Sequence, residues 1–453
     1  MTSRFPRLSS MDLTNLAVEA PETPMHIGVL AVLNGRSLCD ANGRLRLAAL
    51  RIDIDGLLAG VPELRRIVRR PGRLAGPPLW VDDRSFRIDR HVNEVVLPVP
   101  GDEAVLLRLT EELLAPLLDR EHPMWRIWFI TGLPDGRVAA VIALHHAIAD
   151  GLAAVGLLTA LLDPDTATTT KPWVPTAPPQ WRDLARDNFR IGLATMRRLA
   201  HLPDPRRLAG SLSGGWRVLG QAWRAPRTSL TGPIGPQRAL AVQRLDLATA
   251  KRIAHAHGGK VNDVVLDLAA GGLRALLRSR GESVDLNVHA AVAASPRNEK
   301  PAPRTGNRAG IIVVKLPLDE PDPAARLRLI RANSDRAKRE QILTTEQGMM
   351  LWLARLGLLR RYTRRQRLTT IVESDVIGPP APIRLLGAEV VDMIPIGALA
   401  GNLAISFLAF SYAGILTITV RVDAERHPDF PVLVAAMAQD WHSLTTEAAP
   451  ARA

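Results

Sequence analysis

The chain contains very few of the residues that carry covalent chemistry. Its 453 residues include one cysteine, Cys39, so no disulfide can form within the chain. Disulfide-stabilised proteins belong mainly to oxidising compartments, so this cysteine usage predicts a cytoplasmic protein. Cys39 follows Gly-Arg-Ser-Leu and has no adjacent basic partner to activate it, so we interpret it as a structural thiol rather than a nucleophile.

Long apolar runs and several well-known motifs are also absent. No stretch reaches the roughly 18 consecutive apolar residues of a membrane span, and the N-terminus lacks the basic start and apolar core of a secretory signal. We find no phosphate-binding glycine loop, no His-Glu-x-x-His zinc motif and no Gly-x-Ser-x-Gly elbow. His255 and His257 are two residues apart on an expected helix and do not face each other. We therefore predict no metal and no permanently bound cofactor, which leaves direct transfer between two substrates.

Negative charge is under-represented. The chain has 58 Lys and Arg against 45 Asp and Glu, a net charge of +13. The segment from Trp181 to Leu240 alone holds 11 Arg, no Lys and three Asp, together with Phe189, Trp216 and Trp223. Arginine among interfacial aromatics favours an anionic membrane or lipid-droplet surface, bound peripherally, while a solvated basic linker is the simpler interpretation. No recognition motif accompanies the charge, so we do not predict a nucleic acid partner.

Length and composition predict two domains of about 200 residues each. Short apolar stretches such as Ile27–Leu33 alternate with helical patterns such as Ala104–Leu117, which indicates an α/β or α+β fold with a mixed sheet in each half. Pro-, Gly- and Arg-rich sequence lies between the halves. We therefore divide the chain into an N-terminal half at 1–165, a basic crossover at 166–236 and a C-terminal half at 237–453.

Two elements of the C-terminal half are also predicted from the pattern. We expect helices over 247–257 and from Val261 to Arg280, with Gly281 as the C-terminal stop of the second. Strand-like runs follow at 288–292, 311–316, 404–410 and 415–422.

The most informative motif is His145-His146-Ala-Ile-Ala-Asp150-Gly151, which begins where the apolar run Val138–Leu144 ends. A helical pattern follows it, so the histidines lie at a predicted strand-to-helix junction. Imidazole has a pKa of roughly 6.5 and can accept a proton from a hydroxyl group.

Simpler interpretations apply to each residue of this motif. A histidine in an apolar stretch is usually a packed core residue. Asp150 can cap the following helix by accepting from its first N–H groups. Gly151 lets the backbone turn closely beside the histidines.

Further segments show that the chain resembles the bacterial wax ester synthase/acyl-CoA:diacylglycerol acyltransferase family over nearly its whole length. The histidine motif alone is shared with condensation domains of peptide synthetases, and the pair Asn262-Asp263 separates this family best from them. The segments that carry the resemblance are Leu8-Ser9-Ser10-Met11-Asp12, Pro24-Met25-His26-Ile27-Gly28, Trp80-Val81-Asp82, His91-Val92, Pro123-Met124-Trp125, Pro226-Arg227-Thr228 and Val261-Asn262-Asp263-Val264-Val265-Leu266.

The resemblance implies a two-domain CoA-dependent acyltransferase fold with an active-site tunnel between the halves. It implies transfer of an acyl group from acyl-CoA, as co-substrate, to diacylglycerol, with a long-chain fatty alcohol as the alternative acceptor. We expect His146 to act as general base without a covalent acyl-enzyme. His145 would hold the loop or tune its neighbour, and Asp150 would fix the turn, with Arg297 as a candidate partner by its place in a family motif.

Asn262 has two open interpretations. It can supply an amide donor to the oxyanion or order the second domain against the first, or it can form an ordinary N-cap box with Asp263. Two segments depart from the family pattern: Ala293-Ala294-Ser295-Pro296-Arg297 replaces Pro-Val-Ser-x-Arg, and Ser374-Asp375-Val376-Ile377 replaces Ser-Asn-Val-Pro. The second change exchanges an amide for a carboxylate, which bears on efficiency or acceptor preference more than on fold.

Two other functions compete with acyl transfer from CoA. The basic window is compatible with a peripheral lipid-binding protein that has a vestigial site. A condensation-type enzyme using a carrier-bound acyl group is the third hypothesis, although no carrier domain is attached. The intact histidine motif favours catalysis over the former, and the Pro-Met-His-Ile-Gly and Asn-Asp segments favour the CoA-dependent family over the latter.

Overall fold

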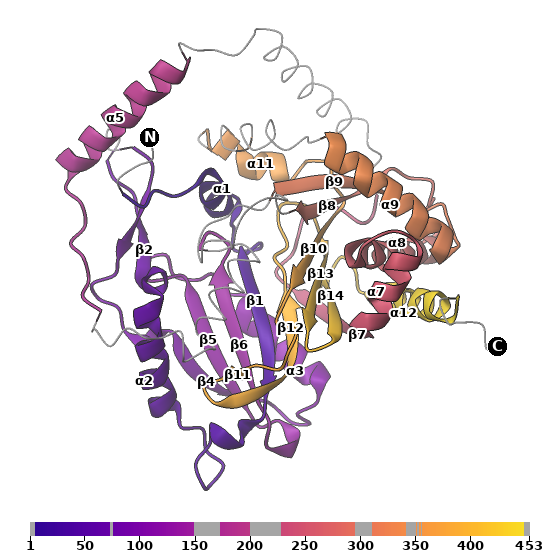
Figure 1. Ribbon diagram of the computed structural model, residues 1–453, viewed down its shortest axis with the longest axis horizontal. Helices are drawn as coiled ribbons and strands as arrows, with labels where there is room; N and C mark the ends of the chain where they lie inside the picture. Colours follow the sequence, from indigo (N-terminus) through magenta and orange to yellow (C-terminus); the bar gives the residue numbers. More distant parts are fainter. Residues whose placement is uncertain are drawn as a thin grey trace.

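Two six-stranded mixed sheets form the frame of the molecule (Figure 1). The computed structural model describes residues 5–72, 76–148, 173–199, 228–294, 310–340, 350, 353–354 and 356–447. In spatial order, the first sheet contains β11 (Arg384–Leu385), β12 (Ala388–Ile396), β1 (His26–Leu33), β6 (Val138–His145), β5 (Trp125–Thr131) and β4 (Val92–Val96). The second contains β7 (Arg238–Asp246), β14 (Ile415–Asp423), β13 (Ile405–Tyr412), β10 (Ile371–Ile377), β8 (Val288–Ala294) and β9 (Gly310–Leu316).

Helices cover both sheets, so the fold is the mixed α/β class that the sequence predicts. A small antiparallel pair of strands, β2 and β3, stands beside the first sheet. The described helices are α1 (Ser10–Val18), α2 (Leu47–Leu57), α3 (Glu103–Leu114), α5 (Trp181–Leu199), α7 (Leu247–Ala256), α8 (Val261–Ser279), α9 (Pro323–Glu340), α11 (Leu359–Thr363) and α12 (Phe430–Glu447), and the two further strands are β2 (Arg66–Arg69) and β3 (Leu79–Asp82).

Strand β6 is central in the first sheet and is buried at every position. Its even-numbered residues from Val138 to Leu144 pack into the core that includes α2, and its odd-numbered residues pack into the core that includes α3. A strand covered on both faces has a continuous apolar sequence, which is why the run was recognisable. Its antiparallel pairing with β1 places His26 opposite His145.

Helix α8 is the central helix of the second half. It is buried along most of its length and packs beside the second sheet and α12 (Figure 1). Gly272 allows the close approach of α12, because a Cβ atom there would lie 2.9 Å from the Leu433 carbonyl oxygen. The helix ends as predicted, with Gly281 in the left-handed region at φ 69°.

The two halves are interlocked by strand exchange. Strand β12 follows most of the second half in sequence but pairs antiparallel with β1 in the first sheet. The segment 237–453 therefore contributes two strands to the first sheet, which the sequence did not indicate. The predicted boundaries at 165 and 236 stay predictions.

Most of the individually predicted elements are confirmed. The strands near Ile27–Leu33 and Val138–Leu144 and the helices over 247–257 and 261–280 are present with small shifts of their ends. The helix predicted over Ala104–Leu117 is α3, which ends at Leu114. The helix expected after Gly151 lies outside the described residues. Within the described ranges, no helix is long and apolar enough to cross a membrane.

Candidate active site

The two histidines lie at the end of β6, where the strand is fixed on both sides. The His145 amide donates to the Met124 carbonyl at 2.9 Å, and the His146 amide donates to the Met25 carbonyl at 2.8 Å. The side chain of His145 is completely buried, whereas His146 is half-buried. Of the two histidines, only His146 is therefore partly exposed.

The ring of His145 has a defined orientation. Its Nδ1 accepts a hydrogen bond of 2.9 Å from the Ala147 amide, so the proton of the neutral ring lies on Nε2. Nε2 is 3.2 Å from Glu19 Oε1, a close contact bent too far for a regular hydrogen bond. His145 is therefore held between the backbone of its own loop and a buried acid.

Glu19 is the buried acid, and donors surround its carboxylate. The Met25 amide donates to Oε1 at 3.1 Å, and Arg120 donates to Oε2 through Nη2 at 2.7 Å and Nε at 3.2 Å. Burial would raise the pKa of Glu19, but the contacts with His145, Arg120 and Met25 outweigh it and lower the pKa to about 2. Glu19 is therefore ionised across the physiological range.

His26 is the third histidine of this cluster, and it is buried and neutral. The Leu118 amide donates to its Nε2 at 3.2 Å, which leaves the proton on Nδ1, 3.3 Å from the Leu114 carbonyl. Burial lowers the pKa of His26 to about 4. Its ring lies edge-on to His145 with centroids 6.3 Å apart.

Helix α1 contacts His146 through Asn15. The Asn15 amide nitrogen donates to the His146 carbonyl at 3.1 Å and lies 3.4 Å from His146 Nδ1. Neither Asn15 nor Glu19 was among the predicted site residues. Both stand between the two N-terminal family segments, and the only signal was a polar or acidic residue in an otherwise apolar stretch.

Three of the predicted site residues lie outside the described residues. These are Asp150, Gly151 and Arg297. The capping role of Asp150, the turn at Gly151 and the pairing with Arg297 stay predictions.

The Asn262-Asp263 pair lies in the first turn of α8, where the helix-capping interpretation holds for the second residue. Lys260 occupies the N-cap position, and its amide donates to Asp263 Oδ2 at 2.8 Å. The Asn262 amide group, turned to satisfy its neighbours, donates to Glu373 at 2.9 and 3.2 Å. Among the described residues, the structure thus brings Asn262 to β10, and the contact with the histidines across the halves stays a prediction.

Two family models match this chain. The wax ester synthase/diacylglycerol acyltransferase catalytic domain matches residues 8–265, more than half of the sequence, and the C-terminal domain of the same family matches residues 305–445. The chain belongs to the wax ester synthase/diacylglycerol acyltransferase family. It is therefore an acyltransferase, as the resemblance predicted.

Relatives and solved structures agree with this assignment. A protein of Mycobacterium tuberculosis (strain ATCC 25618 / H37Rv) named "Probable diacyglycerol O-acyltransferase tgs1" is 31% identical over 377 residues, which cover 79% of each chain. The wax ester synthase/diacylglycerol acyltransferase from Marinobacter aquaeolei VT8 has a similar fold, with a TM-score of 0.69, 23% identity and coverage of 98% of this chain and all of that one. The first condensation domain of the calcium-dependent antibiotic synthetase shares the fold at a TM-score of 0.61 and 15% identity, covering 100% and 98% of the two chains. The predicted two-domain fold is thus confirmed.

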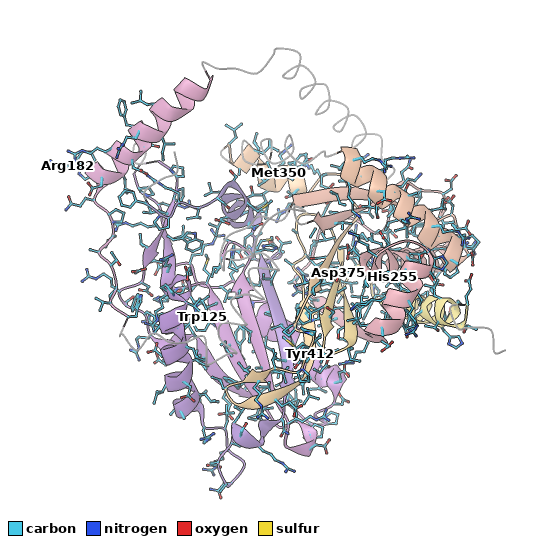
Figure 2. The ribbon with its side chains drawn as sticks, viewed as in Figure 1. Trp125, Arg182, His255, Met350, Asp375 and Tyr412 are labelled. Carbon is cyan, nitrogen blue, oxygen red and sulfur yellow. The ribbon has the colours of Figure 1, made fainter. Side chains whose placement is uncertain are left out.

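Asp375, where this acyltransferase departs from the family pattern, lies two residues from the buried Glu373 on β10. Burial first, and then the neighbouring Asp375, raise the pKa of the fully buried Glu373 well above its usual range. Burial also raises the pKa of Asp375 to about 6. The raised pKa favours the neutral form of Glu373, whose oxygens face the Asn262 amide. Figure 2 shows Asp375 near the middle of the molecule, on the strands of the second sheet.

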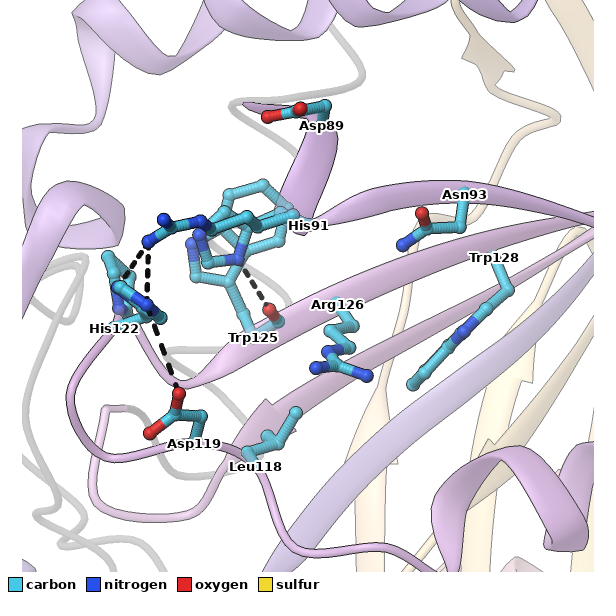
Figure 3. Close-up of a pocket in the computed structure, with 11 residues that line it drawn as sticks. Asp89, His91, Asn93, Leu118, Asp119, His122, Trp125, Arg126 and Trp128 are labelled. Atoms are coloured by element: carbon cyan, nitrogen blue, oxygen red, sulfur yellow. Dashed lines mark hydrogen bonds and ion pairs between the residues drawn. The ribbon is translucent and has the colours of Figure 1, made fainter. Parts of the chain in front are cut away.

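A separate pocket of about 500 Å³ opens beside β4 and β5 (Figure 3). Its walls include His91 and Trp125, which carry part of the family resemblance. The His91 ring stacks on Trp125 at 4.5 Å and donates from Nδ1 to the Trp125 carbonyl at 2.9 Å. Burial lowers the pKa of His91 to about 4, so the ring is a neutral packing group.

Cys39 behaves as a structural thiol. It is free and half-buried, and burial, followed by Asp40 and Glu94, raises the pKa of its thiol. A raised pKa disfavours the nucleophilic thiolate. The described residues also contain no cluster of three or more His, Cys, Asp or Glu side chains that would hold a metal ion.

Proposed function

We propose that this acyltransferase moves a fatty acyl group from acyl-CoA to the hydroxyl group of diacylglycerol, with His146 as general base. The observation that carries the proposal is the half-buried His146 beside a fully buried His145 that contacts Glu19 at the end of β6. One imidazole is accessible and its neighbour is fixed. This arrangement suits a base that must be presented to a substrate in one orientation.

The reaction proceeds by direct attack. His146 takes the hydroxyl proton while the acceptor oxygen forms a bond to the thioester carbonyl carbon. The resulting oxyanion collapses, the carbon–sulfur bond breaks, and the imidazolium returns the proton to the departing CoA thiolate. The products are triacylglycerol and free CoA, and no acyl-enzyme forms.

Asn262 suits an ordering role better than direct oxyanion binding. Its amide nitrogen already donates to both oxygens of Glu373. The amide joins α8 to β10, which are both in the second half, so this contact orders the second half internally rather than against the first. In this proposal Asp150 fixes the turn after the histidines, with Arg297 as its partner.

The test of the general base is His146→Ala. We expect at least a 100-fold loss of transfer from labelled palmitoyl-CoA to dioleoylglycerol, because general base catalysis contributes about 10²–10⁴-fold. Circular dichroism checks the fold, and His442→Ala, an exposed histidine on α12, is the matched control. Full activity of His146→Ala would exclude this role.

Acceptor choice is tested in the same assay. Dioleoylglycerol and hexadecanol supplied together at equal concentration compete for one acyl pool. A predominance of triacylglycerol supports the proposal, whereas a predominance of wax ester supports the alternative acceptor.

We further propose that the enzyme meets an anionic lipid surface peripherally through α5. Arg182, Arg186, Phe189 and Leu193 recur at helical spacing on one face, and all four are exposed, with 68% of Phe189 accessible. The opposite face is attached to the body, since Leu184 packs against β2 and β3. Figure 2 shows Arg182 at the periphery of the molecule. A basic face with protruding apolar side chains suits lipid headgroups and the acyl chains beneath them.

A further inference from the structure

Helix α1 reaches both histidines of the motif from one face. Asn15 and Glu19 are four residues apart, at the last turn and the C-cap of α1, so they project on the same side. Asn15 contacts His146 and Glu19 contacts His145, at 3.1 and 3.2 Å. Two side chains at helical spacing thus meet two adjacent residues of a strand end.

We propose that Asn15 and Glu19 form a positioning clamp for acyl transfer: Glu19 fixes the ring of His145, and Asn15 fixes the main chain and ring of His146. The proposal rests on the proposed role of His146. Both clamp residues act through the histidines and need no contact with substrate.

The carboxylate of Glu19 has little freedom to leave His145. Its side chain is 1% exposed, and the Met25 amide and Arg120 hold the two oxygens separately. Arg120 also donates to the Leu16 carbonyl at 2.9 Å, which attaches the guanidinium to the same helix. A buried carboxylate costs little when donors compensate it, so this cluster is rigid as well as charged.

The ring of His145 is equally restricted. Rotation about its side-chain bonds would break the hydrogen bond from Ala147 and move Nε2 away from the acid. The Met25 amide binds Glu19, and the Met25 carbonyl accepts from the His146 amide. Glu19 therefore restricts the position of His146 through two sets of contacts. One set runs through His145, and the other runs through the backbone of Met25.

The clamp is also connected to the second half. Arg360 on α11 donates to the Glu19 carbonyl at 2.6 Å, and Leu359 packs with Val18 and Met25. The position of the histidines thus depends on contacts from both halves. A base displaced by about 1 Å loses on the order of 100-fold in rate, so this support has catalytic consequences.

The experiment compares Glu19→Gln, Glu19→Ala and Asn15→Leu in the full-length enzyme. Glu19→Gln keeps the shape and one acceptor oxygen but removes the charge, and we expect kcat to fall about 10-fold. Glu19→Ala removes the contact entirely, and we expect about 100-fold. Asn15→Leu removes both contacts with His146 at similar volume, and we expect about 10-fold. In each variant KM for palmitoyl-CoA and for dioleoylglycerol should stay within threefold.

Glu22→Gln is the matched control, because this glutamate lies three residues beyond Glu19 but is about half exposed in its pair with Arg364. Its kcat should equal that of the parent. Thermal unfolding separates positioning from folding: a purely structural role would lower the midpoint and leave kcat of the folded enzyme unchanged. Folded Glu19→Ala and Asn15→Leu with kcat within twofold of the parent would overturn the clamp. Full activity of His146→Ala would instead exclude the general-base role of His146, irrespective of the results for the clamp variants.

Discussion

Buried titratable groups surround the two histidines, and their contacts assign each a protonation state. Glu19 is ionised because three donors surround it, and His26 is neutral because burial disfavours its cation. The amide of Ala147 places the proton of neutral His145 on Nε2, facing Glu19. A charged acid next to a fixed imidazole is a common way to orient a neighbouring base. At the scale of single residues, the site is therefore organised by desolvation and hydrogen bonds rather than by exposed charge.

His91 gives a residue-scale prediction about acid stability. Its pKa is about 4 in the folded protein and roughly 6.5 in the unfolded chain, so the unfolded chain gains a proton first as the pH falls. The free energy of unfolding therefore decreases between about pH 6.5 and pH 4. His91→Asn keeps a donor to the Trp125 carbonyl but does not titrate. Between pH 7 and pH 4.5, we expect the free energy of unfolding to fall by about 2 kcal/mol more in the parent than in this variant. Urea unfolding at the two pH values measures this difference.

The comparison of variant with parent isolates this one group, because other buried residues titrate in the same range. Burial lowers the pKa of His427 to about 4 as well, which adds to the acid loss in both proteins. Equal losses in the parent and in His91→Asn would contradict a neutral His91.

Helix α5 provides a prediction at the scale of one element. Burying a Phe or Leu side chain contributes about 1.5–3 kcal/mol, so Phe189→Ser with Leu193→Ser should weaken binding to phosphatidylglycerol vesicles at least 10-fold. Arg182→Gln with Arg186→Gln should weaken it most at low salt, since each arginine contributes about 1 kcal/mol by charge. Vesicle flotation with and without phosphatidylglycerol measures both.

The matched control for α5 is Ile52→Ser with Val391→Ser, two exposed apolar residues on other elements. These substitutions should not change flotation. Transfer from acyl-CoA to detergent-dispersed dioleoylglycerol should stay at the parent's level in all of these variants, because α5 lies away from the histidines. Undiminished flotation of the Phe189 and Leu193 double variant would exclude α5 as the lipid-binding element.

Elements with a strong local pattern were predictable, and elements defined by partners were not. The apolar run of β6 identifies itself because burial on both faces leaves apolar residues, and α8 identifies itself because apolar residues recur at helical spacing. Strand β12 has a similar strand pattern, but no local signal says that it joins the first sheet. Asn15 and Glu19 meet the histidines across more than 120 residues of sequence, and that approach depends on how α1 packs. His145 and His146 were therefore found from sequence, and their supports required the structure.

At the scale of the whole molecule, a buried ion pair and a set of exposed ion pairs join the halves where β12 also crosses. Arg421 on β14 binds Glu111 on α3 through three hydrogen bonds of 2.9, 3.1 and 2.6 Å, with both side chains about 7% exposed or less. Arg244 on β7 binds Glu103 on α3 and Asp392 on β12. Strand pairing and ion pairs at the same boundary predict that the halves unfold together rather than as independent domains.

The Glu111–Arg421 pair allows this coupling to be measured. Removing one partner of a buried pair leaves an uncompensated charge, so Glu111→Ala and Arg421→Met should each lower the free energy of unfolding by about 3–5 kcal/mol. The double variant Glu111→Leu with Arg421→Met leaves no buried charge and should lose less than the sum of the two single variants. Glu22→Ala, at the exposed pair with Arg364, should change stability by less than about 1 kcal/mol.

Chemical unfolding followed by two probes decides whether the pair joins the halves or stabilises only one. Tryptophan fluorescence reports on Trp125 and Trp128 in the first sheet and on Trp441 against the second core, and far-ultraviolet circular dichroism reports on the helices of both halves. In the parent the two probes should give one common midpoint. In Glu111→Ala both probes should again give one midpoint, at a lower denaturant concentration, because β12 still anchors the second half to β1. Separate midpoints in the parent would contradict the coupling, since an interlocked sheet cannot lose one half while the other keeps all its strands.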